Sequence, residues 1–169
     1  MFKPDYSQEY VLQTWYSPDN ALYRATEHPT IKLAGEVGEL LDCYGKHTFK
    51  PGYDWHNLGK DGLPIVVSEL GDVSYYLRIL TWQHDLSFID EFGKAKLLDD
   101  SILDYIKMMY CYAGNVLYCG ATSDLLMVIV GYKNLLRKLG YSLDYILTTN
   151  YRKLNSDETK HGWAGAGIK

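Results

Sequence analysis

Four acidic side chains lie in two short segments that are otherwise rich in apolar residues. Glu36 and Glu39 are three residues apart in GEVGEL, and Glu69 and Asp72 have the same spacing in ELGDVSYYL. Carboxylate oxygens are hard ligands that suit Mg²⁺ or Mn²⁺, and bound Mg²⁺ keeps positions for water and for the phosphates of a substrate. These residue types therefore indicate a divalent-metal site that serves phosphate chemistry.

Helical periodicity predicts that each acid pair borders a buried face. At about 100° per residue, the apolar residues of each segment fall on one stripe of a helix, and the acids lie on the flank of that stripe in the same sense. The two stripes are Leu33, Val37, Leu40, Leu41 and Tyr44, and Val66, Leu70, Val73, Leu77 and Leu80. If the stripes pack together, the carboxylates converge. Two like charges about 5 Å apart repel by roughly 3 kcal/mol, so this arrangement needs a cation.

Two other interpretations of the acids stay open at this point. Glu-x-x-Glu pairs are commonly solvated helix faces, and the chain would then be a helical interaction protein without affinity for a metal. A di-iron carboxylate bundle is disfavoured because it uses Glu-x-x-His pairs, and neither acid pair has a His at that spacing.

The composition predicts one compact domain in the cytoplasm. A chain of 169 residues with 47% hydrophobic residues is long enough for one core. Its formal net charge is −4 and it has no run of basic residues, so the sequence does not predict binding to a nucleic-acid polymer. The longest apolar run, LLMVIV, is too short for a membrane span, and the first residues do not resemble a signal peptide. Cys43, Cys111 and Cys119 lack metal-binding spacing and are expected to be reduced and mostly buried.

The pattern along the chain predicts an all-α fold. Helices are expected at about 5–16, 28–49, 64–84, 87–98, 101–119, 123–139 and 142–154. Ser87, Ser101, Ser123 and Ser142 are expected N-caps, and Gly140 is an expected C-terminal stop. Turn residues predict breaks at 17–20 and 52–63, and the polar, Gly-rich tail at about 155–169 is expected to be flexible.

The acidic segments resemble a known family of all-α enzymes. KLAGEVGELLD followed by SELGDVSYYL is similar to the ExxE and ExxD signature of the MazG-like nucleoside triphosphate pyrophosphohydrolases, and GYSLDYILTTNYRKL at 140–154 is similar to the closing helix of that family. The resemblance implies a single-domain helical bundle that assembles as a homodimer or homotetramer. It implies a metal site for Mg²⁺, with Mn²⁺ as an alternative, formed by Glu36, Glu39, Glu69 and Asp72.

The same resemblance implies substrate contacts outside the acid quartet. Asn150 and Lys153, in the closing helix, are expected to contact phosphate or sugar. Tyr76 follows Asp72 by four residues, where the related deoxycytidine triphosphate pyrophosphatases place a Tyr against the sugar; a packed core Tyr is the alternative. His28 lies where that branch brings the chain close to the nucleotide, and a helix N-cap is its alternative.

The expected activity is Mg²⁺-dependent hydrolysis of a nucleoside triphosphate between its α- and β-phosphates, which releases the monophosphate and pyrophosphate. A deoxynucleotide is the expected substrate. The 29 residues between Glu39 and Glu69 and the ending SDETKHGW depart from the family in regions that face the base, so the preferred base stays open. A non-catalytic nucleotide- or metal-binding module and a helical interaction protein are the alternative functions.

Overall fold

Seven helices make up the computed structural model, which describes residues 2–15 and 27–155. They are α1 (Tyr6–Trp15), α2 (Glu27–Phe49), α3 (Ile65–Gln83), α4 (Phe88–Lys94), α5 (Ile102–Cys119), α6 (Thr122–Leu139) and α7 (Leu143–Asn155). Within the described ranges there is no β-strand, only an isolated bridge between Leu58 and Pro64. The predicted all-α, single-domain fold is confirmed. None of these helices is long and apolar enough to cross a lipid bilayer.

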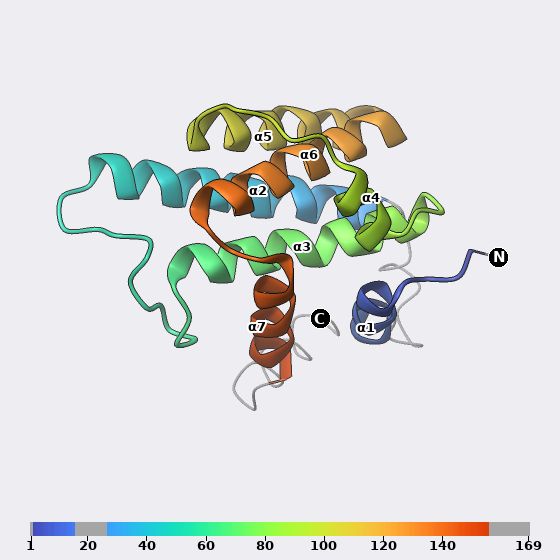
Figure 1. The fold of residues 1–169 in the computed structure, drawn as a ribbon, viewed down its shortest axis with the longest axis horizontal. Coiled ribbons are helices and arrows are strands. Elements are labelled where there is room, and N and C mark those ends of the chain that lie inside the picture. Colours follow the sequence, from blue (N-terminus) through green and yellow to red (C-terminus); the bar gives the residue numbers. More distant parts are fainter. Residues whose placement is uncertain (1, 16–26, 156–169) are drawn as a thin grey trace.

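Helices α2 and α3 lie side by side through the middle of the molecule (Figure 1). Helix α5 covers α2 and runs antiparallel to α6 (Figure 1), and α6 packs in turn on α3 and α4. Helices α7 and α1 both pack on α3, at different points along its length (Figure 1). Helix α3 therefore contacts most of the other elements, which explains why thirteen of its residues are buried.

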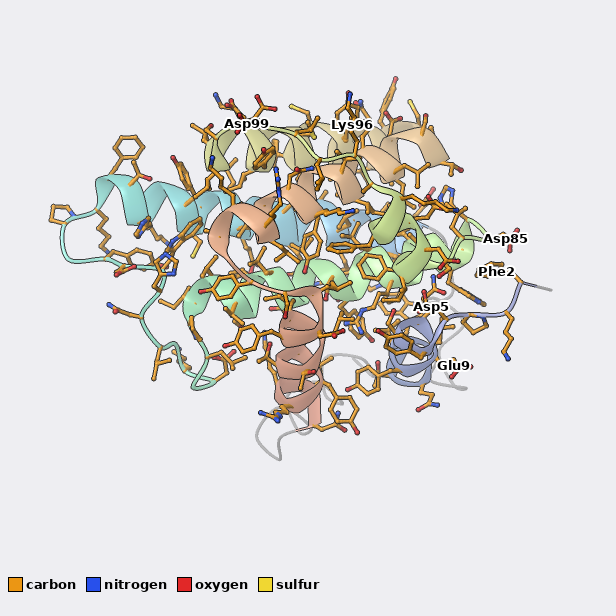
Figure 2. All side chains as sticks on the ribbon, in the orientation of Figure 1. Phe2, Asp5, Glu9, Asp85, Lys96 and Asp99 are labelled. Carbon is orange, nitrogen blue, oxygen red and sulfur yellow. The ribbon has the colours of Figure 1, made fainter. Side chains whose placement is uncertain are left out.

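The apolar stripes of α2 and α3 meet in one core, as their periodicity predicts. Leu33, Val37 and Leu40 are fully buried in α2, and the whole predicted stripe of α3 is buried as well. Figure 2 shows side chains filling the space between these helices. Burial of each such Leu or Val contributes about 1.5–3 kcal/mol to stability, so this contact holds the two acidic segments in register.

Local capping signals fix three helix starts and one helix end as predicted. The hydroxyls of Ser87, Ser101 and Ser142 accept hydrogen bonds from the backbone N–H three residues later, at 3.2, 3.1 and 3.1 Å. Gly140 has a φ of 81° and ends α6 in the left-handed conformation, which costs a residue without a Cβ nothing. These four helix ends could be predicted because each depends on residues that are close in the sequence.

The predicted N-cap at Ser123 is wrong. Helix α6 begins at Thr122, and Ala121 holds the N-cap position without a side-chain hydrogen bond. Gly120, with a φ of 67°, ends α5 and turns the chain at once into α6, so the helix starts before the Ser signal. The Thr122 hydroxyl lies 2.7 Å from Nδ1 of His84, a contact that joins this turn to the end of α3.

Helix α4 ends at Lys94, four residues before the predicted end at 98. Residues 96–100 have no regular structure, and backbone groups of Lys96 and Leu98 bond to α6 instead. The Oδ1 atom of Asn134 accepts the N–H of Leu98 at 2.8 Å, and its Nδ2 donates to the carbonyl of Lys96 at 2.8 Å. A side chain 36 residues away thus replaces the hydrogen bonds that a longer helix would supply.

Two of the three cysteines are exposed, so the prediction of mostly buried thiols is wrong for them. Cys43 is buried in α2, whereas Cys111 and Cys119 lie on the outer surface of α5. Helix α5 buries the opposite side, which carries Met109 and Ala113, against its neighbours. The break predicted at 17–20 and nearly all of the predicted tail lie outside the described residues, but residue 155 belongs to α7.

Candidate metal centre

Three of the four predicted acids lie close together between α2 and α3. One carboxylate oxygen from each of Glu36, Glu69 and Asp72 lies within 4.8 Å of the other two. Glu36 precedes the buried Val37, and Glu69 precedes the buried Leu70. Packing of the two apolar stripes therefore places both acids at the edge of the contact between α2 and α3. We call Glu36, Glu69 and Asp72 the carboxylate trio.

Glu39 lies outside the trio and is exposed. Three residues along an α-helix rotate the side chain by about 300°, so Glu39 is turned roughly 60° away from Glu36 toward solvent. Its charge is nevertheless one of the causes, after burial, that raise the pKa values of all three trio members. A metal-binding role for Glu39 stays a prediction.

Burial and mutual repulsion disfavour the charged forms of the trio. Burial first, and the charge of Asp72 second, raise the pKa of Glu36 and of Glu69 to about 7. Burial also raises the pKa of Asp72, against the opposing effect of the Lys153 ammonium. The Oε2 atom of Glu69 is buried and has no hydrogen-bond partner within residues 2–15 and 27–155. A buried carboxylate oxygen among like charges requires a proton or a cation.

Lys153, on α7, neutralises part of this negative charge. Its Nζ atom lies 2.6 and 2.8 Å from the two carboxylate oxygens of Asp72, and 2.8 Å from the hydroxyl of Ser68. The ammonium therefore donates hydrogen bonds to both carboxylate oxygens of Asp72, a potential metal ligand. The phosphate contact predicted for Lys153 stays a prediction, and it requires that Lys153 leave Asp72.

Asn150 is buried one turn before Lys153, against Gly71 of α3. Its exposed fraction is 2%, and a Cβ atom added at Gly71 would lie 3.0 Å from its Nδ2. Glycine at this position lets α7 approach α3 closely enough for Lys153 to reach Asp72. The Oδ1 atom of Asn150 accepts a hydrogen bond of 2.8 Å from Arg78, while its Nδ2 has no hydrogen-bond partner among the described residues. Substrate contact by Asn150 stays a prediction.

Arg78 joins α1, α3 and α7 through hydrogen bonds, and it was not identified from the sequence. It is 2% exposed, and it donates to the carbonyls of Ser7 in α1 at 3.3 Å and of Ser74 in α3 at 3.2 Å, besides its bond to Asn150. Burial lowers its pKa to about 10, so it stays charged near neutral pH. The available signal was an Arg within the apolar run VSYYLRIL, because a charge in a buried stretch needs hydrogen-bond partners.

An aromatic cluster borders the trio on the side of α1. The ring of Trp15 stacks on His28 at 5.0 Å and meets Tyr76 edge-on at 5.9 Å between centroids. Burial, followed by the charges of Glu36 and Asp72, raises the pKa of Tyr76, which places its phenol close to the carboxylates. Tyr76 is only 8% exposed, so both the sugar contact and the core role remain compatible with its position.

His28 is not an N-cap, because it lies inside α2 with Glu27 before it. Its imidazole is held by the Trp15 stack, and a nucleotide contact stays a prediction. Trp15 was not identified from the sequence, since its approach to α2 depends on how α1 docks on α3. Lys32 lies one turn before Glu36, and its Nζ is 3.8 Å from Oε1 of Glu36.

Comparison of the chain with models of known protein families, with curated proteins and with solved structures finds no match. The function is therefore inferred from the residues of the site, their geometry and the motifs they form.

Without divalent ions, the protein is expected to lose stability between pH 5 and pH 8. The pKa of Glu36 and Glu69 is about 7 in the folded chain and near the ordinary 4.5 after unfolding, so the folded state binds these protons more tightly. The free energy of unfolding therefore falls as pH rises from 4.5 through 7, by about 3 kcal/mol for the pair after allowance for solvent screening. Urea denaturation in EDTA, compared with a Glu36→Gln/Glu69→Gln variant, measures this contribution. An equal pH dependence in both proteins would contradict it.

Proposed function

We propose that this chain is a Mg²⁺-dependent nucleoside triphosphate pyrophosphohydrolase of the MazG-like kind. One molecule of water and one nucleoside triphosphate give the nucleoside monophosphate and pyrophosphate. The observation that carries the proposal is the carboxylate trio, in which three acids from two packed helices lie within 4.8 Å of one another and Glu69 keeps a buried oxygen without a hydrogen bond.

The donor atoms of the trio fit Mg²⁺, with Mn²⁺ as an alternative. All are carboxylate oxygens, and Mg²⁺ binds through a few carboxylates while it keeps water and substrate phosphates in its remaining positions. Bound metal would supply neutralising charge for the triphosphate and a water of lowered pKa. The carboxylate that orients this water is left unassigned among Glu36, Glu69 and Asp72.

The surroundings of the trio support a nucleotide over free pyrophosphate. Trp15, His28 and Tyr76 place aromatic surface beside the acids, which suits a base or sugar next to bound phosphates. The ammonium of Lys153 lies beside Asp72 of the trio. It can donate to a phosphate oxygen once a metal neutralises Asp72. We extend the proposal, on the motif resemblance, to a deoxynucleotide substrate and a cytoplasmic homodimer or homotetramer; light scattering measures the assembly.

The decisive experiment is a pyrophosphate-release screen over the canonical ribo- and deoxyribonucleoside triphosphates, with Mg²⁺ and with EDTA. Reaction in ¹⁸O-labelled water identifies the bond that is cleaved. Attack at the α-phosphorus puts the label in the monophosphate, whereas attack at the β-phosphorus puts it in pyrophosphate. Label in the monophosphate, and only with divalent ions, is the expected result.

The same screen separates the proposed enzyme from the two alternatives. If no triphosphate is hydrolysed but calorimetry detects Mg²⁺ and a non-hydrolysable triphosphate, the chain is a binding module. If neither turnover nor binding occurs, the chain is a helical interaction protein and the proposed function is wrong.

Millimolar Mg²⁺ is expected to raise the melting temperature of the wild-type chain at pH 8. An ion present at a hundred times its dissociation constant adds about 2.7 kcal/mol to the free energy of unfolding, equivalent to roughly 5–10 °C for a chain of this size. Differential scanning calorimetry with and without Mg²⁺ measures the shift. The Glu69→Gln variant is the control, since it lacks one ligand. A wild-type shift no larger than that of the variant would count against the site.

A further inference from the structure

A second group of metal-type ligands lies at the other end of α2. One ring nitrogen from each of His47 and His56 and one carboxylate oxygen of Asp54 lie within 4.8 Å of one another. His47 belongs to the last turn of α2, and the other two residues belong to the loop that leads to α3. His47 follows Glu36 by eleven residues, about 16 Å along the helix axis, so this group is separate from the carboxylate trio.

Trp55 holds the loop and both imidazoles in place. Its side chain is 1% exposed, and its ring stacks on His47 with 5.1 Å between centroids and 14° between planes. The carbonyl of Trp55 accepts the N–H of Val66 at 2.9 Å, which ties the loop to the first turn of α3. The ligand atoms are therefore presented from a loop that is anchored at both of its ends.

Hydrogen bonds from Trp55 leave a lone pair on one nitrogen of each ring. Its backbone N–H donates to Nδ1 of His47 at 3.4 Å, and its indole N–H donates to Nε2 of His56 at 3.1 Å. Both donors are N–H groups that cannot accept, so both ring nitrogens act as acceptors, as they must to bind a metal. The Nδ1 atom of His56 lies 3.4 Å from the hydroxyl of Tyr141, which can accept its proton and hold this tautomer.

A cation would make the contact between His47 and Asp54 attractive, although Oδ1 of Asp54 also accepts the backbone N–H of His56 at 2.9 Å. Nδ1 of His47 lies 3.4 Å from Oδ1 of Asp54, and with the lone pair on Nδ1 two acceptors face each other. A proton or a metal ion between them makes the contact attractive. Bonds of about 2.0–2.1 Å in tetrahedral geometry place two ligands of one Zn²⁺ roughly 3.4 Å apart, so the observed separation suits a shared ion.

A hollow of about 760 Å³ opens beside the two imidazoles. It lies between the ends of α2, α5 and α6, and Asp99 and Asp100 line it together with Lys138. Asp99 is labelled at the outer edge of the molecule in Figure 2. Acidic residues around a hollow raise the local concentration of cations, and the space admits water or another ligand on a bound ion.

We propose that His47, Asp54 and His56 bind a divalent transition metal ion of the Zn²⁺ class, with a coordination position open to this hollow. Two imidazoles and one carboxylate suit Zn²⁺ or Co²⁺, whereas the carboxylate trio suits Mg²⁺. The chain then holds two cation sites of different chemistry, and the second does not depend on the proposed hydrolase activity. Binding replaces both hydrogen bonds that Trp55 donates, to Nδ1 of His47 and to Nε2 of His56.

Competition between the metal-free full chain and a chromophoric chelator for Zn²⁺ tests the site. The titration is done with excess Mg²⁺ and in a Cys111→Ser/Cys119→Ser background, so that neither the trio nor exposed thiols bind Zn²⁺. One equivalent of Zn²⁺ is expected to bind, and His56→Gln or Asp54→Asn should weaken binding about 10- to 100-fold. His84→Gln, at the far end of α3, is the matched control and should leave the affinity unchanged.

Nitrogen NMR of the histidine rings supplies a readout that needs no variant at the site. Addition of Zn²⁺ should shift the ring nitrogens of His47 and His56 and leave those of His84 in place. Absence of Zn²⁺ binding, equal affinity in His56→Gln and the parent chain, or shifts confined to other histidines would each overturn the proposal. A shift on acidification without any shift on adding Zn²⁺ would mean that a proton alone bridges His47 and Asp54.

Discussion

The Glu69→Gln variant is expected to release pyrophosphate at least about 10²- to 10³-fold more slowly than the wild type at saturating Mg²⁺. The substitution keeps the shape of the side chain but removes a negative ligand whose Oε2 atom lies buried in the trio without a hydrogen bond. Asp72→Asn is expected to have a loss of the same order. Initial rates of pyrophosphate release measure both.

Stability measurements keep this result from being confused with unfolding. Removal of one charge relieves repulsion in the trio, so Glu69→Gln should be at least as stable as the wild type in EDTA at pH 8. Asp42→Asn is the matched control, since it removes an exposed acid of α2 that pairs with Lys46 on the same helix. Near-wild-type turnover in Glu69→Gln, or an equal loss in Asp42→Asn, would show that the trio does not hold the catalytic metal.

Lys153→Met is expected to move metal affinity and activity in opposite directions. Without the ammonium, Asp72 loses the cation that lies 2.6 Å from its Oδ2, and the trio becomes more negative. The affinity of the unliganded protein for Mg²⁺ should rise about tenfold, as expected when a unit charge is removed a few ångströms away in a partly screened site. The value of kcat/KM should fall about 100-fold, because a donor to the phosphates is lost.

Calorimetric Mg²⁺ titration and initial rates measure these two effects of Lys153→Met. Arg152→Met is the matched control, because it removes an exposed charge from the adjacent position of α7. A Lys153→Met variant with unchanged Mg²⁺ affinity would contradict the role of Lys153 as the resident counter-ion. Unchanged kcat/KM with raised Mg²⁺ affinity would confine Lys153 to that role and exclude a phosphate contact.

The features that could be predicted from the sequence are those that depend on helical phase and near neighbours. The stripe of α3 and the caps at Ser87 and Ser101 needed only local spacing. The convergence of Glu36 with Glu69 and Asp72 followed from two stripes of the same sense. The exposure of Glu39 could not be predicted in this way. Glu36 and Glu39 differ by only about 60° around the helix, and the edge of the packed surface falls between them.

The features that could not be predicted depend on contacts between distant segments. Asn150 bonds to Arg78 across 72 residues of sequence, and the end of α4 depends on Asn134, 36 residues after Leu98. Ser123 carries an ordinary capping signal, yet Gly120 turns the chain into α6 before it. In the first two cases the hydrogen-bond partner is distant in the sequence, whereas at Ser123 one local signal prevails over another.

The place of α7 at the end of the described helices has a consequence for biosynthesis. A chain emerges from the ribosome with its N-terminal segments first, so α1, α2 and α3 are available before residue 150 exists. Until then, Arg78 lacks Asn150 and the trio lacks the Lys153 ammonium. Nascent chains interrupted before α7 therefore lack the ammonium that pairs with Asp72 and one of the hydrogen-bond partners of Arg78, and they leave uncovered the part of α3 on which α7 packs.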